Sequence, residues 1–151
     1  VVGVRAALPL DATAQRLFDA RFLCAVRRAH PRVRRRLDLA TFAELPHLLI
    51  APRGDPGGAV DEALAARGLR RRVALRVHTF HSAPLVVARS DLVLTAPARV
   101  LEPVAKAFGL RLLPPPIPLA PFAVFQAWHP RVQDDPVHAW FRGVVAAAAR
   151  A

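Results

Sequence analysis

The stretch from Leu69 to Ala98, LRRRVALRVHTFHSAPLVVARSDLVLTAPA, constrains the fold of this chain more than any other segment. Alternating apolar residues at 73–77 predict a strand, which a short polar turn at 78–82 and a small-residue helix follow. A second apolar strand at 92–95 follows, closed by Ala96 and Pro97. A strand, a helix and a strand within about thirty residues form a βαβ unit. The carboxyl ends of parallel strands in such units are where α/β proteins bind small ligands.

The rest of the chain continues this alternation. Apolar runs predict further strands at 1–4, 22–27, 47–51, 110–113 and 122–128. Capping residues, prolines and glycines delimit predicted helices that start at Asp38, span Asp55–Pro56 to Gly68, span 98–108 before Gly109, and start after Asp134 or Asp135. The alternation predicts an α/β fold with a mostly parallel sheet covered on both faces.

The predicted helix at the C-terminal end carries the clearest amphipathic pattern in the chain. Its apolar residues recur at helical spacing and form one stripe: Val137, Trp140, Phe141, Val144 and Val145. A stripe of this kind is typical of a helix that packs on a core.

Composition limits the classes of protein that this chain can belong to. The single cysteine, Cys24, excludes an internal disulfide, and its apolar neighbours predict a buried, inert thiol. The formal charge of +11 invites a nucleic-acid interpretation, but nearly all the basic residues are arginines and no aromatic residues are interleaved with them. We therefore expect the runs at 32–36 and 70–72 to be solvated surface, with weak attraction to DNA phosphates as the alternative. No apolar run is long enough to cross a bilayer.

Four phrases of the sequence resemble the effector-binding domain of LysR-type transcriptional regulators. They are LFDARFLCAVRRAHP at 17–31, the strand LRRRVALRV at 69–77, the block SDLVLTAPARVLEPVAKAFGLRLLPPP at 90–116, and WHPRVQDDPVHAWFR at 128–142. The order and spacing of these phrases carry the resemblance, which extends over residues 1–151.

The resemblance implies a two-lobed fold of the type-2 periplasmic-binding-protein kind, with the ligand between the lobes. Residues 23–118 would form the second lobe, residues 1–22 a remnant of the first, and residues 119–151 its returning segment. The opening part of the first lobe and the DNA-binding region would precede Val1. We therefore expect a fragment of a bacterial, cytoplasmic regulator that contacts DNA only through its missing N-terminal region and assembles as a homo-oligomer.

The candidate ligand-binding residues follow the predicted strands. Thr79, Phe80 and His81 occupy the turn after 73–77, and the resemblance implies that this turn lines the ligand site. A structural turn with Phe80 in the core is the alternative. Ser82 is the expected N-cap of the following helix. The resemblance also brings Thr95 and Pro97 toward the ligand, although a plain helix entry explains them too.

Arg53 follows the strand at 47–51 and could clamp an acidic effector with two hydrogen bonds. An ordinary surface arginine is the alternative. The effector itself is expected to be an organic acid or an aromatic metabolite.

Catalytic, metal and cofactor sites have little support in the sequence. His78 and His81 are three residues apart but lack the further ligands that zinc requires. No glycine-rich phosphate loop with a lysine occurs, and the adjacent His81 and Ser82 do not suggest a catalytic triad. We therefore expect neither an enzyme nor a cofactor. A type-2 periplasmic solute receptor shares the predicted architecture and remains the alternative function.

Overall fold

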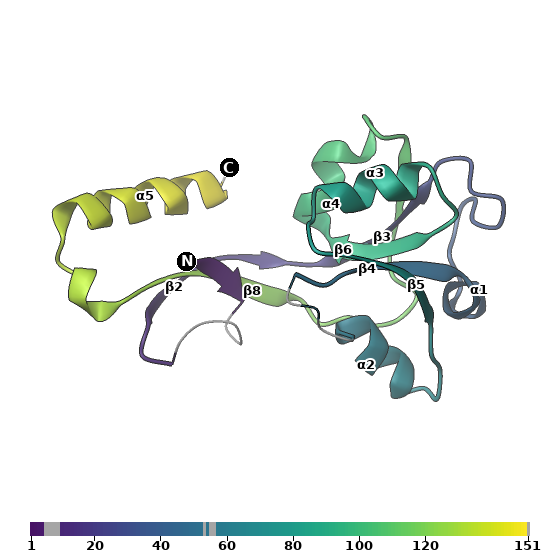
Figure 1. Cartoon of the computed structure of the whole chain (residues 1–151), viewed down its shortest axis with the longest axis horizontal. Coiled ribbons are helices and arrows are strands. Elements are labelled where there is room, and N and C mark those ends of the chain that lie inside the picture. The colour runs from purple at the N-terminus through teal and green to yellow at the C-terminus, as the bar shows by residue number, and fades with distance from the viewer. Residues whose placement is uncertain (5–9, 53, 55–56, 151) are drawn as a thin grey trace. The chain divides into compact units, whose positions relative to one another are not determined.

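The computed structural model describes residues 1–4, 10–52, 54 and 57–150, and the chain divides into two compact units (Figure 1). The small unit comprises residues 1–20 and 121–151, and the large unit comprises residues 21–120.

A five-stranded sheet forms the centre of the large unit. Its strands lie in the order β5-β4-β6-β3-β7. Their bounds are β3 Phe22–Arg27, β4 Pro46–Ile50, β5 Arg72–Val77, β6 Val93–Pro97 and β7 Leu110–Leu113. β4 pairs in parallel with β5 and β6, whereas β3 is antiparallel to both β6 and β7. Four of the five strands therefore run in one direction, which confirms the predicted mostly parallel sheet for this unit.

Helices cover both faces of this sheet, as the alternation predicted. α1 (Leu39–Glu44) and α2 (Ala59–Ala65) contribute to the core on one face, and α3 (Ser82–Ala88) and α4 (Ala98–Ala105) to the core on the other. Figure 1 shows α3 and α4 above the sheet and α2 below it. The run FLCAV at 22–26 is apolar throughout because its side chains alternate between these two cores, Cys24 and Val26 in one and Leu23 and Ala25 in the other.

The helix boundaries confirm part of the prediction. Asp38 caps α1, since its carboxylate accepts a 2.9 Å hydrogen bond from the Thr41 N–H. Asp55 and Pro56 lie outside the described residues, and α2 begins at Ala59 rather than at that dipeptide. The Asp61 carboxylate accepts a 2.9 Å bond from the Gly58 N–H at this later start.

Two glycines terminate helical segments as predicted. Gly68 and Gly109 have φ angles of 68° and 62°, a left-handed conformation in which a side chain would be strained. α4 itself ends at Ala105, three residues before the predicted end at Phe108. A turn from Lys106 to Gly109 then leads into β7.

A three-stranded antiparallel sheet forms the small unit. Its order is β1-β8-β2, with β1 at Val2–Val4, β2 at Thr13–Ala20 and β8 at Phe122–Trp128. The parallel arrangement expected from the sequence therefore does not extend to this sheet. β2 was also not predicted as a strand. Its register shifts between Arg16 and Phe18, and this irregularity interrupts the alternation that would have revealed it.

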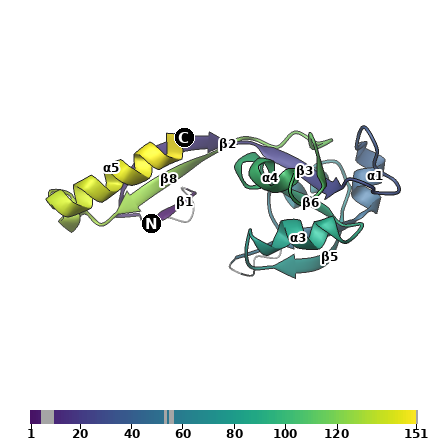
Figure 2. The same ribbon diagram turned by 90° about the horizontal axis from the view of Figure 1, so that it is seen from above.

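The helix α5 (Pro136–Arg150) packs against β2 and β8, and Figure 2 shows it lying along β8. It begins where predicted, because the Asp135 carboxylate accepts a 2.8 Å bond from the His138 N–H. A short 3₁₀ turn, η2 (Pro130–Val132), precedes it.

Four of the five residues of the predicted apolar stripe of α5 are exposed, and the fifth, Val145, is half-buried. Val137 is 74% exposed and Trp140 69%, and Phe141 and Val144 are exposed as well. The less exposed residues of the helix lie on another face: His138, Arg142, Val145, Ala146 and Ala149. The prediction of the helix is thus confirmed, but the described residues do not bury its widest apolar face.

Arg142 joins the end of β8 to the start of α5. Its guanidinium donates to the carbonyl oxygens of Val132 and Gln133, at 3.1 and 2.8 Å. The same group lies over the Trp128 ring, 4.5 Å from its centroid. The small unit is therefore held by polar and cation–π contacts in addition to its sheet.

Candidate functional site

The carboxyl ends of β4, β5 and β6 lie at one end of the large sheet, because these strands run in the same direction. The segments that follow β4 and β5 are hydrogen-bonded to each other. The Ala51 N–H donates to the Val77 carbonyl at 2.8 Å, and His78 Nδ1 is 3.1 Å from the Ala51 carbonyl oxygen. These bonds fix the root of the 78–82 turn on the end of the sheet.

The 78–82 turn presents three predicted ligand-binding residues at the surface. Thr79, Phe80 and His81 are all exposed, and Phe80 has 39% of its area accessible. Phe80 is therefore not a core residue of the turn. An exposed aromatic ring flanked by a hydroxyl and an imidazole offers stacking and hydrogen bonding to a small polar molecule.

Ser82 has a different role from the predicted one. It is the first residue of α3 rather than the N-cap, and His81 precedes the helix without a side-chain capping bond. The Ser82 hydroxyl instead lies 2.8 Å from the Thr79 hydroxyl and donates to the Thr79 carbonyl at 3.2 Å. These bonds join the last residue of the turn to Thr79, and the Phe80 and His81 side chains between them are exposed.

Thr95 and Pro97 lie on β6 at the same end of the sheet. Thr95 is half-buried, and its hydroxyl is 3.4 Å from the Cys24 sulfur on the neighbouring strand. Thr95 therefore faces the side of the sheet that α1 and α2 cover, whereas the 78–82 turn leads into α3 on the opposite side. The structure thus brings both segments to the same end of the sheet.

Cys24 is fully buried, as predicted. Burial raises the pKa of its thiol to about 11, and the bond to Thr95 lowers it by less. A thiol in this state is protonated at neutral pH and makes a poor nucleophile.

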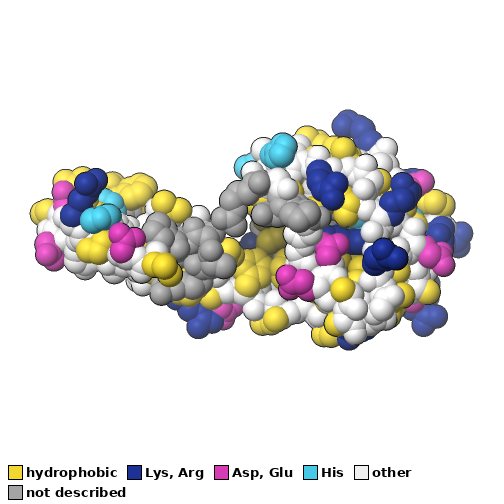
Figure 3. Space-filling view, turned by 60° about the horizontal axis from the view of Figure 1, so that its bottom comes forward, with side chains coloured by type: hydrophobic (Ala, Val, Ile, Leu, Met, Phe, Trp, Pro, Cys, Tyr) yellow, Lys and Arg dark blue, Asp and Glu magenta, His cyan; other side chains and the backbone are white. Residues whose placement is uncertain are grey.

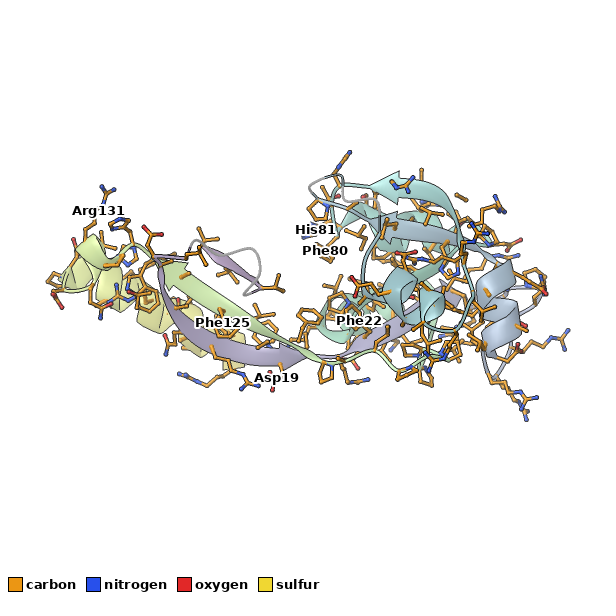
Figure 4. The ribbon with its side chains drawn as sticks, turned by 90° about the horizontal axis from the view of Figure 1, so that it is seen from below. Asp19, Phe22, Phe80, His81, Phe125 and Arg131 are labelled. Carbon is orange, nitrogen blue, oxygen red and sulfur yellow. The ribbon has the colours of Figure 1, made fainter. Side chains whose placement is uncertain are left out.

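Phe22 is a further candidate that the sequence reasoning missed. It is the first residue of β3 and lies directly opposite Pro97, so it belongs to the same end of the sheet as the turn. Figure 4 shows Phe22, Phe80 and His81 along one end of the large unit. Only the antiparallel pairing of β3 with β6 brings Phe22 to this end of the sheet. The sequence pattern predicted parallel strands, and a parallel β3 would have placed Phe22 at the opposite end.

The remaining predicted residues add little to this end of the sheet. Arg53 lies outside the described residues. Within the described part of the chain, no three His, Cys, Asp or Glu side chains are grouped closely enough to hold a metal ion, and His78 and His81 have no further ligand. None of the described helices has the length and apolar character that crossing a bilayer requires.

One of the arginines expected at the surface is buried instead. The Arg71 side chain is only 3% exposed, and it donates two hydrogen bonds to Asp61, from Nε at 2.8 Å and from Nη2 at 2.7 Å. This pair connects α2 to the start of β5. The run at 70–72 is therefore partly structural rather than wholly solvated.

Comparisons with known proteins agree on one family. A family model described as the LysR substrate binding domain matches residues 2–150. The HTH-type transcriptional regulator SyrM of Rhizobium meliloti (strain 1021) is 38% identical over 150 residues, covering 99% of this chain and 46% of that protein. The chain thus spans about half the length of the curated relatives it matches.

Two solved structures show the same fold. The probable transcriptional regulator PA0477 from Pseudomonas aeruginosa has a TM-score of 0.82 and 32% identity, over 94% of this chain and 47% of that one. The regulatory domain of MexT, a transcriptional activator in Pseudomonas aeruginosa, has a TM-score of 0.80 and 27% identity, over 96% of this chain and 70% of that one.

Proposed function

Because the chain belongs to the family of LysR substrate-binding domains, we propose that it is the effector-sensing part of a transcriptional regulator. The observation that carries this proposal is the exposed 78–82 turn, held on the carboxyl ends of β4 and β5 by the His78 and Ala51 contacts. Open α/β sheets bind ligands at such ends. The comparisons favour this function over the alternative of a periplasmic solute receptor.

The proposed effector is a small organic acid or aromatic metabolite. Phe80 would stack on its apolar part, and Thr79 and His81 would hydrogen-bond to its polar groups. Thr95 and Pro97 would complete the site from β6, and Arg53 would pair with a carboxylate. The effector-binding domain of QuiR, which shares this fold at 13% identity with a TM-score of 0.75, has been solved in complex with shikimate.

The remaining expectations about the whole protein are part of the same proposal. Residues 23–118 would be the second lobe of the effector domain, and residues 1–22 and 119–151 parts of the first. The domain would be non-catalytic and cytoplasmic, would need no cofactor, and would assemble as a homo-oligomer. DNA would be bound by a region outside this chain. Full-length CbnR, which has 15% identity to this chain, is known in a complex with its target DNA.

The proposal is tested by a binding screen with paired variants. A panel of carboxylates from benzoate to shikimate is screened by thermal shift, and any stabilising compound is titrated by calorimetry. Phe80→Ala should weaken binding by about tenfold, since loss of a stacking contact costs roughly 1 kcal/mol or more.

The matched control is Leu85→Ala on α3. Leu85 is 41% exposed and Phe80 39%, so both variants remove a comparable exposed apolar side chain. The control should leave the affinity unchanged. Equal losses in the two variants would show that the turn is not the binding site, and a panel that gives no stabilisation would contradict an acidic effector.

A further inference from the structure

A second concave feature lies in the large unit, and its lining is strongly basic. The pocket has a volume of about 410 Å³. Its lining comprises four arginines, one histidine and two small apolar residues: Arg28, Ala29, His30, Pro31, Arg34, Arg35 and Arg111. No carboxylate lines it. Figure 3 shows that Lys and Arg side chains are dispersed over the visible face of the large unit. The arginines at 28, 34, 35 and 111 differ from such dispersed charges because they line a pocket together.

The pocket is at the opposite end of the sheet from the 78–82 turn. Arg27 is the last residue of β3, and β3 is antiparallel to β6. The segment after β3 therefore reaches the start of β6, where His30 Nε2 is 3.2 Å from the Asp91 carbonyl oxygen. Phe22 and Pro97 pair at the other end of the same two strands. The pocket is thus independent of the proposed effector site.

A buried histidine holds the backbone of the pocket in place. His30 is 3% exposed, and its Nδ1 accepts hydrogen bonds from the N–H groups of Arg32 and Val33, at 3.2 and 3.1 Å. Its Nε2 then carries the proton that is donated to the Asp91 carbonyl. Both ring nitrogens are used, so the segment that carries Arg34 and Arg35 leaves the sheet in a fixed direction.

Arg111 from β7 braces the other side of the pocket. Its Nη1 donates to the Val33 carbonyl at 2.9 Å and to the Arg34 carbonyl. The Arg28 N–H donates to the Gly109 carbonyl at 2.8 Å, which ties the end of β3 to the start of β7. The basic side chains are therefore carried by a backbone that is already ordered.

The nearby carboxylates are occupied by other arginines. Asp91 accepts a 2.6 Å bond from Arg27, and Glu44 accepts a 2.6 Å bond from Arg32. In the described part of the chain, none of the four lining arginines forms an ion pair of this kind. Four arginines thus line one pocket that has no carboxylate in its lining, an arrangement that attracts anions.

We propose that this pocket binds a small, multiply charged oxyanion such as a phosphate ester or a polycarboxylate. Guanidinium groups recognise phosphate and carboxylate oxygens with paired hydrogen bonds. A volume of about 410 Å³ is within the range of small-molecule sites. A concave corner suits such a molecule better than the backbone of a DNA duplex, which lies along an extended surface. The regulator would then respond to a second metabolite independently of the first.

The test uses pyrophosphate and citrate as probes on the whole chain. Each is titrated by calorimetry at constant ionic strength, with sodium chloride as the reference salt. Arg34→Ala and Arg35→Ala should each weaken pyrophosphate binding by about tenfold, because each removes a charge-assisted contact. Both side chains are exposed, so neither variant should disturb the fold.

Arg89→Ala is the matched control, since Arg89 is an exposed arginine of the same unit outside the pocket. It should bind both probes like the parent chain. Equal weakening in Arg89→Ala, or heats that chloride reproduces, would show general charge attraction and overturn the proposal. A labelled duplex that binds through Arg34 and Arg35 while neither probe binds would also overturn it, in favour of DNA.

Discussion

Acid should destabilise the large unit through a single histidine, His47 at the start of β4. The side chain is fully buried, its Nε2 donates to the Phe42 carbonyl at 2.7 Å, and its ring contacts the Phe42 ring edge-on. Its Nδ1 is 3.5 Å from Nη1 of Arg71. Burial lowers the pKa of His47 from 6.5 to about 4; the Phe42 bond acts in the opposite direction, and the Arg71 charge adds to the lowering.

The direction of the effect follows from proton binding. Between pH 6.5 and about 4 the unfolded state protonates this histidine and the folded state does not. The free energy of unfolding therefore decreases as the pH falls through that window. The difference between a pKa of 6.5 and one of about 4 corresponds to about 3 kcal/mol.

The matched variant is His47→Gln, whose amide can donate to the Phe42 carbonyl but does not titrate. Unfolding by urea is followed by far-ultraviolet circular dichroism from about pH 7 to about pH 4. His47→Gln will be less stable at neutral pH, and the gap between the two proteins should narrow by about 3 kcal/mol as the pH falls. A gap that stays constant, or a His47 ring that titrates near 6.5 by NMR, would refute the reasoning.

Three further predictions concern single contacts. Asp61→Asn should lower the free energy of unfolding in urea by about 2–3 kcal/mol, because it leaves the buried Arg71 guanidinium without its carboxylate. This value is near the lower limit for a buried pair, since the Asp61 side chain is 34% exposed while that of Arg71 is 3% exposed. An unchanged stability would contradict the prediction and would mean that water replaces the carboxylate as the partner of Arg71. Arg142→Ala should cost about 2 kcal/mol, measured by tryptophan fluorescence, because it removes two carbonyl bonds and the contact with Trp128, and an unchanged unfolding midpoint would contradict this. Cys24 should not react with a thiol reagent at about pH 8 until the chain is denatured, since its pKa is about 11; labelling of the folded protein would disprove it.

The sequence predicted those elements that a local pattern marks, such as a continuous apolar run or a capping residue. β3 was predicted correctly because both of its faces are buried. Its first five residues, FLCAV, are therefore all apolar, and Arg27 ends the strand. α1 was recognised because Asp38 provides a local cap. β2 escaped because the shift between Arg16 and Phe18 disturbs its alternation.

The sites depend on pairings between distant segments, and sequence patterns carry little of that information. Thr79, Phe80 and His81 could be predicted as one turn because they are contiguous. Phe22 joins them only through the antiparallel partnership of β3 and β6. The basic pocket likewise requires β3 to lie beside β7, which brings Arg111 to a loop that is far away in the chain.

The exposed apolar stripe of α5 carries a tryptophan, Trp140, whose fluorescence would report binding to that stripe. Trp140 lies on that stripe and is 69% exposed, whereas Trp128, the only other tryptophan, is already covered by the guanidinium of Arg142. Any molecule that settled on the stripe would move one indole out of water and shift its emission to shorter wavelength. The large unit contains no tryptophan and would add no background to that signal.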